Sequence, residues 1–115
     1  MRVVCVSLGD DRRSDPWLTL NKEYQVISVE LRPRGVAKLR IIADDHRTPI
    51  LVDSSLFAAN GEPLPTNWVC TIREGGTVEF EPQSWAELDF WERYFDRDPV
   101  AMTVFEEELR RMTEG

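Results

Sequence analysis

The sequence predicts a mostly β (α+β) domain: a small antiparallel barrel of five to six strands, followed by two C-terminal helices. Two segments of alternating hydrophobicity, residues 24–43 and 68–81, each have a turn near the centre and predict β-hairpins. From residue 84 the apolar period lengthens from two to about 3.6, the period of a helix. Strands followed by helices within 115 residues indicate a single domain, 1–115, with the barrel in 1–82 and a helical extension in 84–112.

The first predicted hairpin joins residues 24–31 to residues 37–43. Its register follows from matching the apolar faces, since a slip of one residue would turn every core side chain to the wrong side. The matched pairs are Val29 with Leu39, Ile27 with Ile41, and Glu30 with Lys38. Lys38, Arg40 and Ile42 then lie on the outer face.

The second predicted hairpin has a glycine loop, Glu74-Gly75-Gly76, between two short strands. Its register pairs Arg73 with Thr77. The side chains expected to face the barrel interior are Trp68, Cys70, Ile72, Val78 and Phe80. Thr77, Glu79 and Glu81 are expected to face outward.

Both cysteines of the chain, Cys5 and Cys70, lie in strand-like apolar segments. We expect two reduced thiols buried in the core, because free cysteine packs as a small hydrophobic residue. A disulfide between them would require neighbouring strands.

The remaining β part predicts a valine-rich strand at 2–8, a loop at 9–16, a short strand at 49–53 and a serine-capped helical turn at 54–57. Residues 58–66 contain an Asn-Gly pair and two prolines and predict a loop.

Two start signals mark the helices. Ser84 and Glu87 have the spacing of a capping box, and Asp98-Pro99 places a cap directly before a proline at the first helical position. The buried stripe of the second helix is expected to contain Ala101, Val104, Phe105, Leu109 and Met112. Glu106, Glu107 and Glu108 are expected to point largely outward.

No motif of the chain indicates catalysis, so we expect a protein that is not an enzyme and has no cofactor. The sequence has no phosphate-binding glycine loop, no metalloprotease helix and no nucleophile elbow. Asp44, Asp45 and His46 could bind a divalent ion together with Asp10 and Asp11, but paired acids in turns usually form the turn itself. We therefore predict no metal site.

The net charge of −7 is divided unevenly along the chain. Residues 1–60 carry a net charge of +1 and residues 61–115 a net charge of −8. An acidic surface repels phosphate and favours basic protein partners. The C-terminal half also has more aromatic residues than one short helix can bury, which suggests an anchor for a partner. The predicted partner-binding residues are Glu87, Asp89, Glu92, Tyr94, Glu106, Glu107 and Glu108.

An alternative site lies on the first hairpin, where basic residues gather. Arg32, Arg34, Lys38 and Arg40 could contact nucleic acid, with Arg47 nearby. The aromatic side chains that single-strand binding requires are not interleaved with them, so nucleic acid is the less favoured partner.

Export and membrane insertion are not expected. The N-terminal apolar run is short and is followed at once by Asp10 and Asp11, and no apolar stretch approaches the roughly 20 residues of a membrane span. We therefore predict a cytoplasmic protein.

Three segments resemble small, mostly uncharacterised bacterial proteins that have an SH3-like barrel and a helical tail. They are residues 18–26, 41–45 and 90–95. The first segment is similar to a Leu-Thr-x-Gly-Lys-x-Tyr pattern, with Asn21 in place of the usual glycine; asparagine tolerates a positive φ better than most residues. Some proteins of this appearance are immunity proteins against toxins or accessory proteins of mobile elements. The resemblance implies the fold more strongly than any activity.

These observations favour a non-enzymatic protein-binding module, with an immunity-like inhibitor as one form of it, that binds a basic partner through the acidic helical half. The alternative is a nucleic-acid-associated SH3-like module that uses the first hairpin. A small enzyme or metal-binding domain is the third hypothesis.

Overall fold

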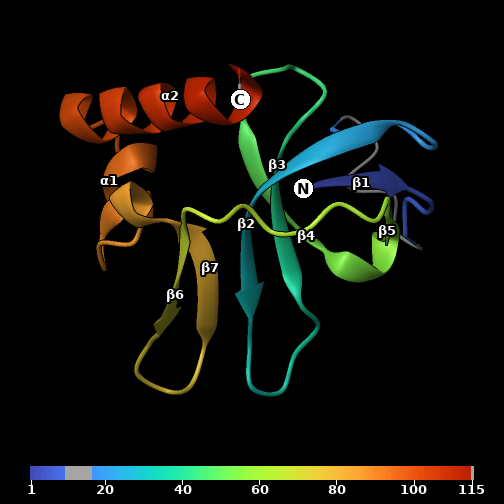
Figure 1. Cartoon of the computed structure of the whole chain (residues 1–115), viewed down its shortest axis with the longest axis horizontal. Helices are drawn as coiled ribbons and strands as arrows, with labels where there is room; N and C mark the ends of the chain where they lie inside the picture. The colour runs from blue at the N-terminus through green and yellow to red at the C-terminus, as the bar shows by residue number, and fades with distance from the viewer. Residues whose placement is uncertain (10–16, 115) are drawn as a thin grey trace.

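The computed structural model describes residues 1–9 and 17–114, and most of the predicted loop at 9–16 lies outside this range, as do Asp10 and Asp11. The strands are β1 (Arg2–Cys5), β2 (Glu23–Leu31), β3 (Lys38–Ile42), β4 (Pro49–Asp53), β5 (Phe57–Ala59), β6 (Trp68–Ile72) and β7 (Val78–Pro82). Two helices follow, α1 (Phe90–Phe95) and α2 (Pro99–Glu114), and short 3₁₀ turns occupy Ser54–Leu56 and Gln83–Trp85. Figure 1 shows the helices gathered at one end of the sheet.

The strands form one antiparallel sheet of seven strands that is not closed into a barrel. The main path runs β4-β3-β2-β1-β5, and β7 pairs with the far end of β2 and carries β6 on its other side. The hairpins β2–β3 and β6–β7 therefore extend side by side in the same direction (Figure 1). A closed barrel requires its outer strands to pair with each other, and within the described residues β6 pairs with β7 alone. The predicted mostly β sheet with two helices is confirmed, whereas the predicted closed barrel of five to six strands is wrong.

A β-bulge at Ile27 sets which side chains of β2 reach each of two separate cores. The expected pairs Val29 with Leu39 and Glu30 with Lys38 are present, but Val26 lies opposite Ile41 and Ile27 has no partner in β3. The extra residue shifts the side-chain alternation along β2. The predicted pair of Ile27 with Ile41 is therefore wrong.

The two cores contain different parts of the sequence. The first lies inside the curved sheet and is made of Val3, Cys5, Leu18, Tyr24, Val26, Leu39, Ile41 and Val52. The second lies between the sheet and the helices and is made of Ile27, Trp85, Phe90, Ala101 and Phe105. Ile27 is thus the β2 residue that joins the helical core.

The hairpin β6–β7 has the predicted register and turn but a different exposure from the one predicted. Cys70 lies opposite Phe80, Ile72 opposite Val78, and the Arg73 N–H donates to the Thr77 carbonyl at 2.8 Å. Ile72 is 73% exposed, however, and Cys70 is exposed. These side chains would be interior only in a closed barrel, so the open sheet leaves them in solvent.

The other side of this hairpin also differs from the prediction. Glu81, expected to face outward, is 1% exposed because the helices cover that face of β7. Of the two cysteines, Cys5 is buried as predicted and Cys70 is not, and both are free thiols.

The segment with the SH3-like resemblance folds around one carboxylate. Asp44 accepts hydrogen bonds from the Thr19 hydroxyl at 2.6 Å, the Lys22 ammonium at 2.8 Å and the Tyr24 hydroxyl at 2.7 Å. Burial opposes ionisation of Asp44, but these three bonds outweigh it and lower its pKa. Asn21 has a φ of 69°, as its substitution for glycine predicts. The motif therefore ties the start of β2 to the turn that follows β3.

The helical part confirms one of the two predicted start signals. The Asp98 carboxylate accepts a hydrogen bond from the Ala101 N–H at 3.1 Å, as an N-terminal cap does. The capping box at Ser84 and Glu87 is not formed, because Gln83–Trp85 is a 3₁₀ turn and α1 begins only at Phe90. Trp85 is fully buried in the second core and fixes this turn by packing rather than by a cap.

The bulge makes a prediction with a matched control. Ile27→Ala should lower the free energy of unfolding by roughly 2–4 kcal/mol, since it removes a fully buried side chain from the helical core. Ile72→Ala should cost under about 1 kcal/mol, because this isoleucine is 73% exposed. Urea unfolding followed by circular dichroism measures both values. Equal losses in the two variants would contradict the assigned faces.

Candidate functional site

The aromatic residues of the helical half are mostly buried, as the sequence predicts. Trp85, Phe90 and Phe105 are at most 2% exposed and pack against one another. Tyr94 is half-buried with its ring centroid 4.6 Å from that of Phe105. Phe95, next in the chain, is 53% exposed and contacts the Tyr94 ring at 5.2 Å. One aromatic ring of the cluster is therefore presented to solvent.

Phe95 lies at a hollow between the helices and the turn after β3. The hollow, here called the helix hollow, has a volume of about 540 Å³ and is lined by Arg47, Thr48, Pro49, Tyr94, Phe95, Arg97, Met102 and Glu106. Arg97 has a φ of 64° at the tight connection between α1 and α2, which brings Met102 and Glu106 close to the end of α1. The lining is mixed: Pro49, Tyr94, Phe95 and Met102 are apolar or aromatic, whereas Arg47, Arg97 and Glu106 carry charges of both signs.

The predicted acidic residues do not all remain free. Arg93 forms ion pairs with Glu87 at 2.7 Å, with Asp89 at 3.4 Å and with Asp98 at 3.7 Å. Glu92, Glu106 and Glu107 are exposed and make no ion pair within the described part of the chain. Burial and the nearby Glu106 carboxylate raise the pKa of Tyr94, so this tyrosine stays a neutral hydrogen-bond donor beside the hollow.

Glu108 is not part of an exposed acidic surface, contrary to the prediction. It is 6% exposed and accepts a hydrogen bond from the Ser84 hydroxyl at 3.1 Å, with Arg111 at 3.7 Å. Glu108 lies one turn beyond Phe105 on the face of α2 that packs on the rest of the protein. Its negative charge therefore anchors α2 and is not available to a partner.

Most basic residues of the alternative site on the first hairpin already have partners within the protein. Arg32 pairs with Glu30 at 2.8 Å, and Lys38 forms an ion pair with Asp53. Arg40 was predicted to face solvent, but its guanidinium lies 4.0 Å from the centre of the Trp91 ring. Of the four residues, Arg34 alone is exposed without an ion pair among the described residues. The four cations do not form one continuous surface.

Arg40 belongs instead to a group of charges buried between the sheet and α1. Glu81 accepts a hydrogen bond from the Trp91 indole N–H at 3.1 Å, and Arg73 lies 3.3 Å from Glu79 and 4.0 Å from Glu81. The pKa of Glu81 is raised to about 7, chiefly by burial; the hydrogen bond from the Trp91 indole and the charge of Arg40 lower it, and the adjacent Glu79 raises it. A space of about 40 Å³ remains beside these groups, which is too small for a substrate.

The raised pKa makes stability depend on pH. Because folded Glu81 holds its proton up to about pH 7 and the unfolded carboxyl only to 4.5, the folded state is favoured at low pH and this contribution falls as the pH rises between the two values. The shift in the pKa of Glu81 corresponds to a contribution of roughly 3 kcal/mol to the free energy of unfolding. Glu81→Gln should match the wild type near pH 5 and melt at a higher temperature at pH 8. Thermal melts that differ between the two proteins by the same amount at both pH values would contradict this assignment.

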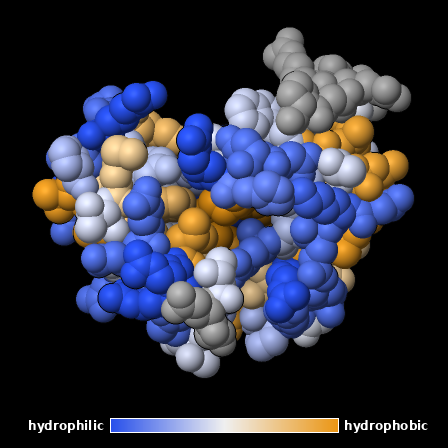
Figure 2. Space-filling model, turned by 90° about the horizontal axis from the view of Figure 1, so that it is seen from above, coloured by the Kyte–Doolittle hydropathy of each residue, from blue (hydrophilic) through white to orange (hydrophobic). Residues whose placement is uncertain are grey.

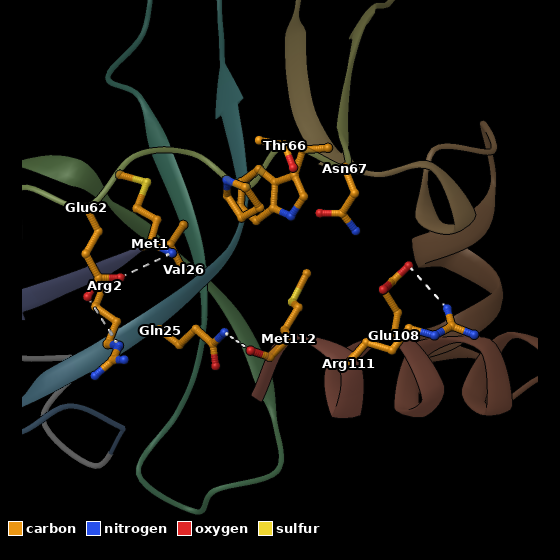
Figure 3. A pocket seen from close by; sticks show the side chains of 12 residues that line it. Met1, Arg2, Gln25, Val26, Glu62, Thr66, Asn67, Glu108, Arg111 and Met112 are labelled. Atoms are coloured by element: carbon orange, nitrogen blue, oxygen red, sulfur yellow. Dashed lines mark hydrogen bonds and ion pairs between the residues drawn. The ribbon is translucent and has the colours of Figure 1, made fainter. Parts of the chain in front are cut away.

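A second cavity, which the sequence did not suggest, lies between the sheet and the C-terminal end of α2. Its volume is about 430 Å³, and Figure 3 shows Met1, Arg2 and Glu62 on one side and Glu108, Arg111 and Met112 on the other. Most of its polar groups already have partners: Glu62 pairs with the N-terminal amine and with Arg2, and the Gln25 side chain donates to the Met112 carbonyl at 3.3 Å. The buried Trp68 indole N–H has no acceptor among the described residues.

The two aspartates in the turn after β3, Asp44 and Asp45, stabilise the turn through hydrogen bonds. Asp45 accepts hydrogen bonds from the backbone N–H groups of Arg47 and Thr48 and from the Thr48 hydroxyl, and these bonds lower its pKa to about 2. Asp44 is held by the three bonds described above. Both carboxylates therefore serve the turn, and the described residues contain no cluster of three or more potential metal ligands.

Comparison of the chain with protein-family models, with curated proteins and with solved structures finds no match. None of the helices in the described part of the chain has the length and apolar content needed to cross a membrane. A functional proposal therefore rests on the surfaces of the molecule. The space-filling view in Figure 2 shows apolar side chains in the middle of one face, bordered by hydrophilic residues.

Proposed function

We propose that the protein is a non-enzymatic protein-binding module that holds a basic partner at the helix hollow. The observation that carries the proposal is the half-exposed ring of Phe95 at a hollow that Tyr94 and Met102 also line, together with the exposed Glu106 carboxylate. An exposed aromatic side chain at a pocket with charged neighbours is a usual setting of an interface anchor.

The two parts of this surface have different tasks. Phe95, Tyr94 and Met102 offer apolar contact to an inserted side chain, which mainly limits the rate of dissociation. Glu106 lines the hollow, and Glu92 and Glu107 are exposed on the same two helices; their negative charge would mainly raise the rate of association with a basic surface. The partner-binding set proposed from the sequence is thus reduced, since Glu108 is buried and Arg93 holds Glu87 and Asp89.

The resemblance to small bacterial proteins with SH3-like barrels and helical tails suggests what kind of module this is. An immunity-like protein would inhibit its target by contact alone, and the acidic helical half would favour a basic target. The cytoplasm is the compartment that this proposal implies. The nucleic-acid alternative is not favoured, because Arg32, Lys38 and Arg40 each have a partner within the protein.

The proposal predicts opposite kinetic effects for two variants. Glu106→Lys combined with Glu107→Lys should slow association with the partner about tenfold at low salt and flatten its salt dependence. Phe95→Ala should leave association nearly unchanged and speed dissociation by about tenfold or more. The partner is first isolated on the immobilised wild-type protein, and both rates are then measured by surface plasmon resonance with the purified partner.

Arg34→Glu is the matched control, because this residue is also exposed and free of ion pairs in the described part of the chain but lies on the first hairpin. It should bind as the wild type does. If Arg34→Glu abolished binding while the two helical variants bound normally, the helix hollow would not be the binding surface and the basic hairpin would replace it.

A further inference from the structure

We propose that β6 pairs with β6 of a second copy of this chain, antiparallel and centred on Cys70. In the part of the chain that the structure describes, β6 pairs with β7 only, so its other edge is open. An open edge presents backbone N–H and C=O groups that can pair with another strand. No residue of β6 lines the helix hollow, and this pairing does not depend on the proposed function.

The backbone groups at the open edge can be identified from the turn of the hairpin. The Arg73 N–H donates to the Thr77 carbonyl, so Arg73 is a hydrogen-bonded position of the β6–β7 ladder. Hydrogen-bonded and non-hydrogen-bonded positions alternate along an antiparallel pair. Thr71 therefore bonds to β7, while Cys70 and Ile72 direct their N–H and C=O groups to the open edge.

The other edge strands of the sheet are protected and β6 is not. The edge strand β4 begins with Pro49 and ends with Asp53, and β5 has only three residues. Proline, charge and short length are the usual devices that prevent edge pairing. By contrast, β6 reads Trp-Val-Cys-Thr-Ile, with no charge and no proline.

The side chains of β6 are complementary to a second copy of the same strand. A two-fold axis at Cys70 places Trp68 opposite Ile72 of the second copy and Val69 opposite Thr71 of the second copy. No like charges meet in this register, and Ile72, which is 73% exposed in the single chain, gains an aromatic neighbour. A partner strand of unrelated sequence would have to reproduce this match, so a second copy is the occupant that the strand itself specifies.

In this register, the backbone groups at the open edge of β6 can form hydrogen bonds with those of the second copy. Reciprocal bonds between the two Cys70 residues and bonds from each Ile72 N–H to the opposing Trp68 carbonyl give about four new backbone hydrogen bonds. The Trp68 N–H already donates to the Pro65 carbonyl at a long 3.4 Å and is not needed. Each chain has a net charge of −7, so the pairing should strengthen as salt screens the repulsion between copies.

The first test is the mass of the full chain in solution, measured by sedimentation equilibrium over a concentration series at low and high salt. The wild type should approach twice the monomer mass as concentration rises, and more readily at high salt. Ile72→Lys should weaken dimerisation at least about tenfold, since it places a charge opposite Trp68 of the second copy. The control Glu74→Lys, in the turn of the same hairpin, should dimerise at least as well as the wild type. A wild type that stays monomeric throughout, or an Ile72→Lys variant that dimerises equally, would overturn the proposal.

The second test locates the axis with a disulfide across the two copies. Hydrogen-bonded antiparallel positions have a Cα–Cα distance of about 5.5 Å, which a disulfide can span. Mild oxidation should link two wild-type chains through Cys70, and Cys70→Ser should abolish the link, because Cys5 is buried. The variant Cys70→Ser with Glu74→Cys controls for random collision and should link much more slowly. Equal linking rates at residues 70 and 74 would place the interface elsewhere and contradict the register.

Discussion

The extra residue at Ile27 in β2 is the constraint on which the rest of the structure depends. Tyr24 and Val26 point into the first core, so alternation turns Ile27 toward the helices, and the bulge then returns Val29 to the first core. Without it, β2 could not place both Val26 and Val29 at the first core while Ile27 packs against the helices. The same shift keeps Val29 and Leu39 in the first core, so a single inserted residue serves both layers.

The helices then determine which polar groups are buried. Because α1 and the turn at Trp85 cover the face of the sheet that carries Arg40 and Glu81, these charges must be satisfied inside the protein. Trp91 contacts both, through its ring face and its indole N–H. As a consequence, the pKa of the Glu81 carboxyl is raised to about 7. The opposite face of the β6–β7 hairpin has no helix over it, and there Cys70 and Ile72 are exposed.

Much of the local structure could be predicted from the sequence. The glycine turn of the second hairpin, the pairing of Glu30 with Lys38 and the cap at Asp98 all follow from residues close in the chain. The bulge could not be predicted, because Ile27 is as apolar as a regular core residue and only the tertiary fold decides which core it joins. The barrel prediction failed for the same reason: closure depends on contacts of β6 with distant strands, which alternation alone does not specify.

The candidate site was predicted in part. An aromatic anchor among acids in the helical half was predicted, but the residue named was Tyr94, which is half-buried, whereas the exposed ring is that of Phe95. Glu108 was assigned to the wrong face because three consecutive glutamates suggest solvent exposure. One of them must lie one turn from Phe105, and helical spacing places Glu108 there. The three ion pairs of Arg93 also could not be predicted from the sequence. They depend on the fold, since one of the partners, Asp98, lies beyond the end of α1.

The most direct test of this account is the environment of the Ile27 methyl groups, observed by nuclear Overhauser spectroscopy of the full chain. If Ile27 lies in the helical core while Val26 and Val29 face the first core, its methyl protons should show cross-peaks to ring protons of Trp85, Phe90 or Phe105 and ring-current shifts to high field. If instead they showed cross-peaks only to Leu39 and Val52 of the first core, β2 would have a regular register and the account of the two cores would be wrong.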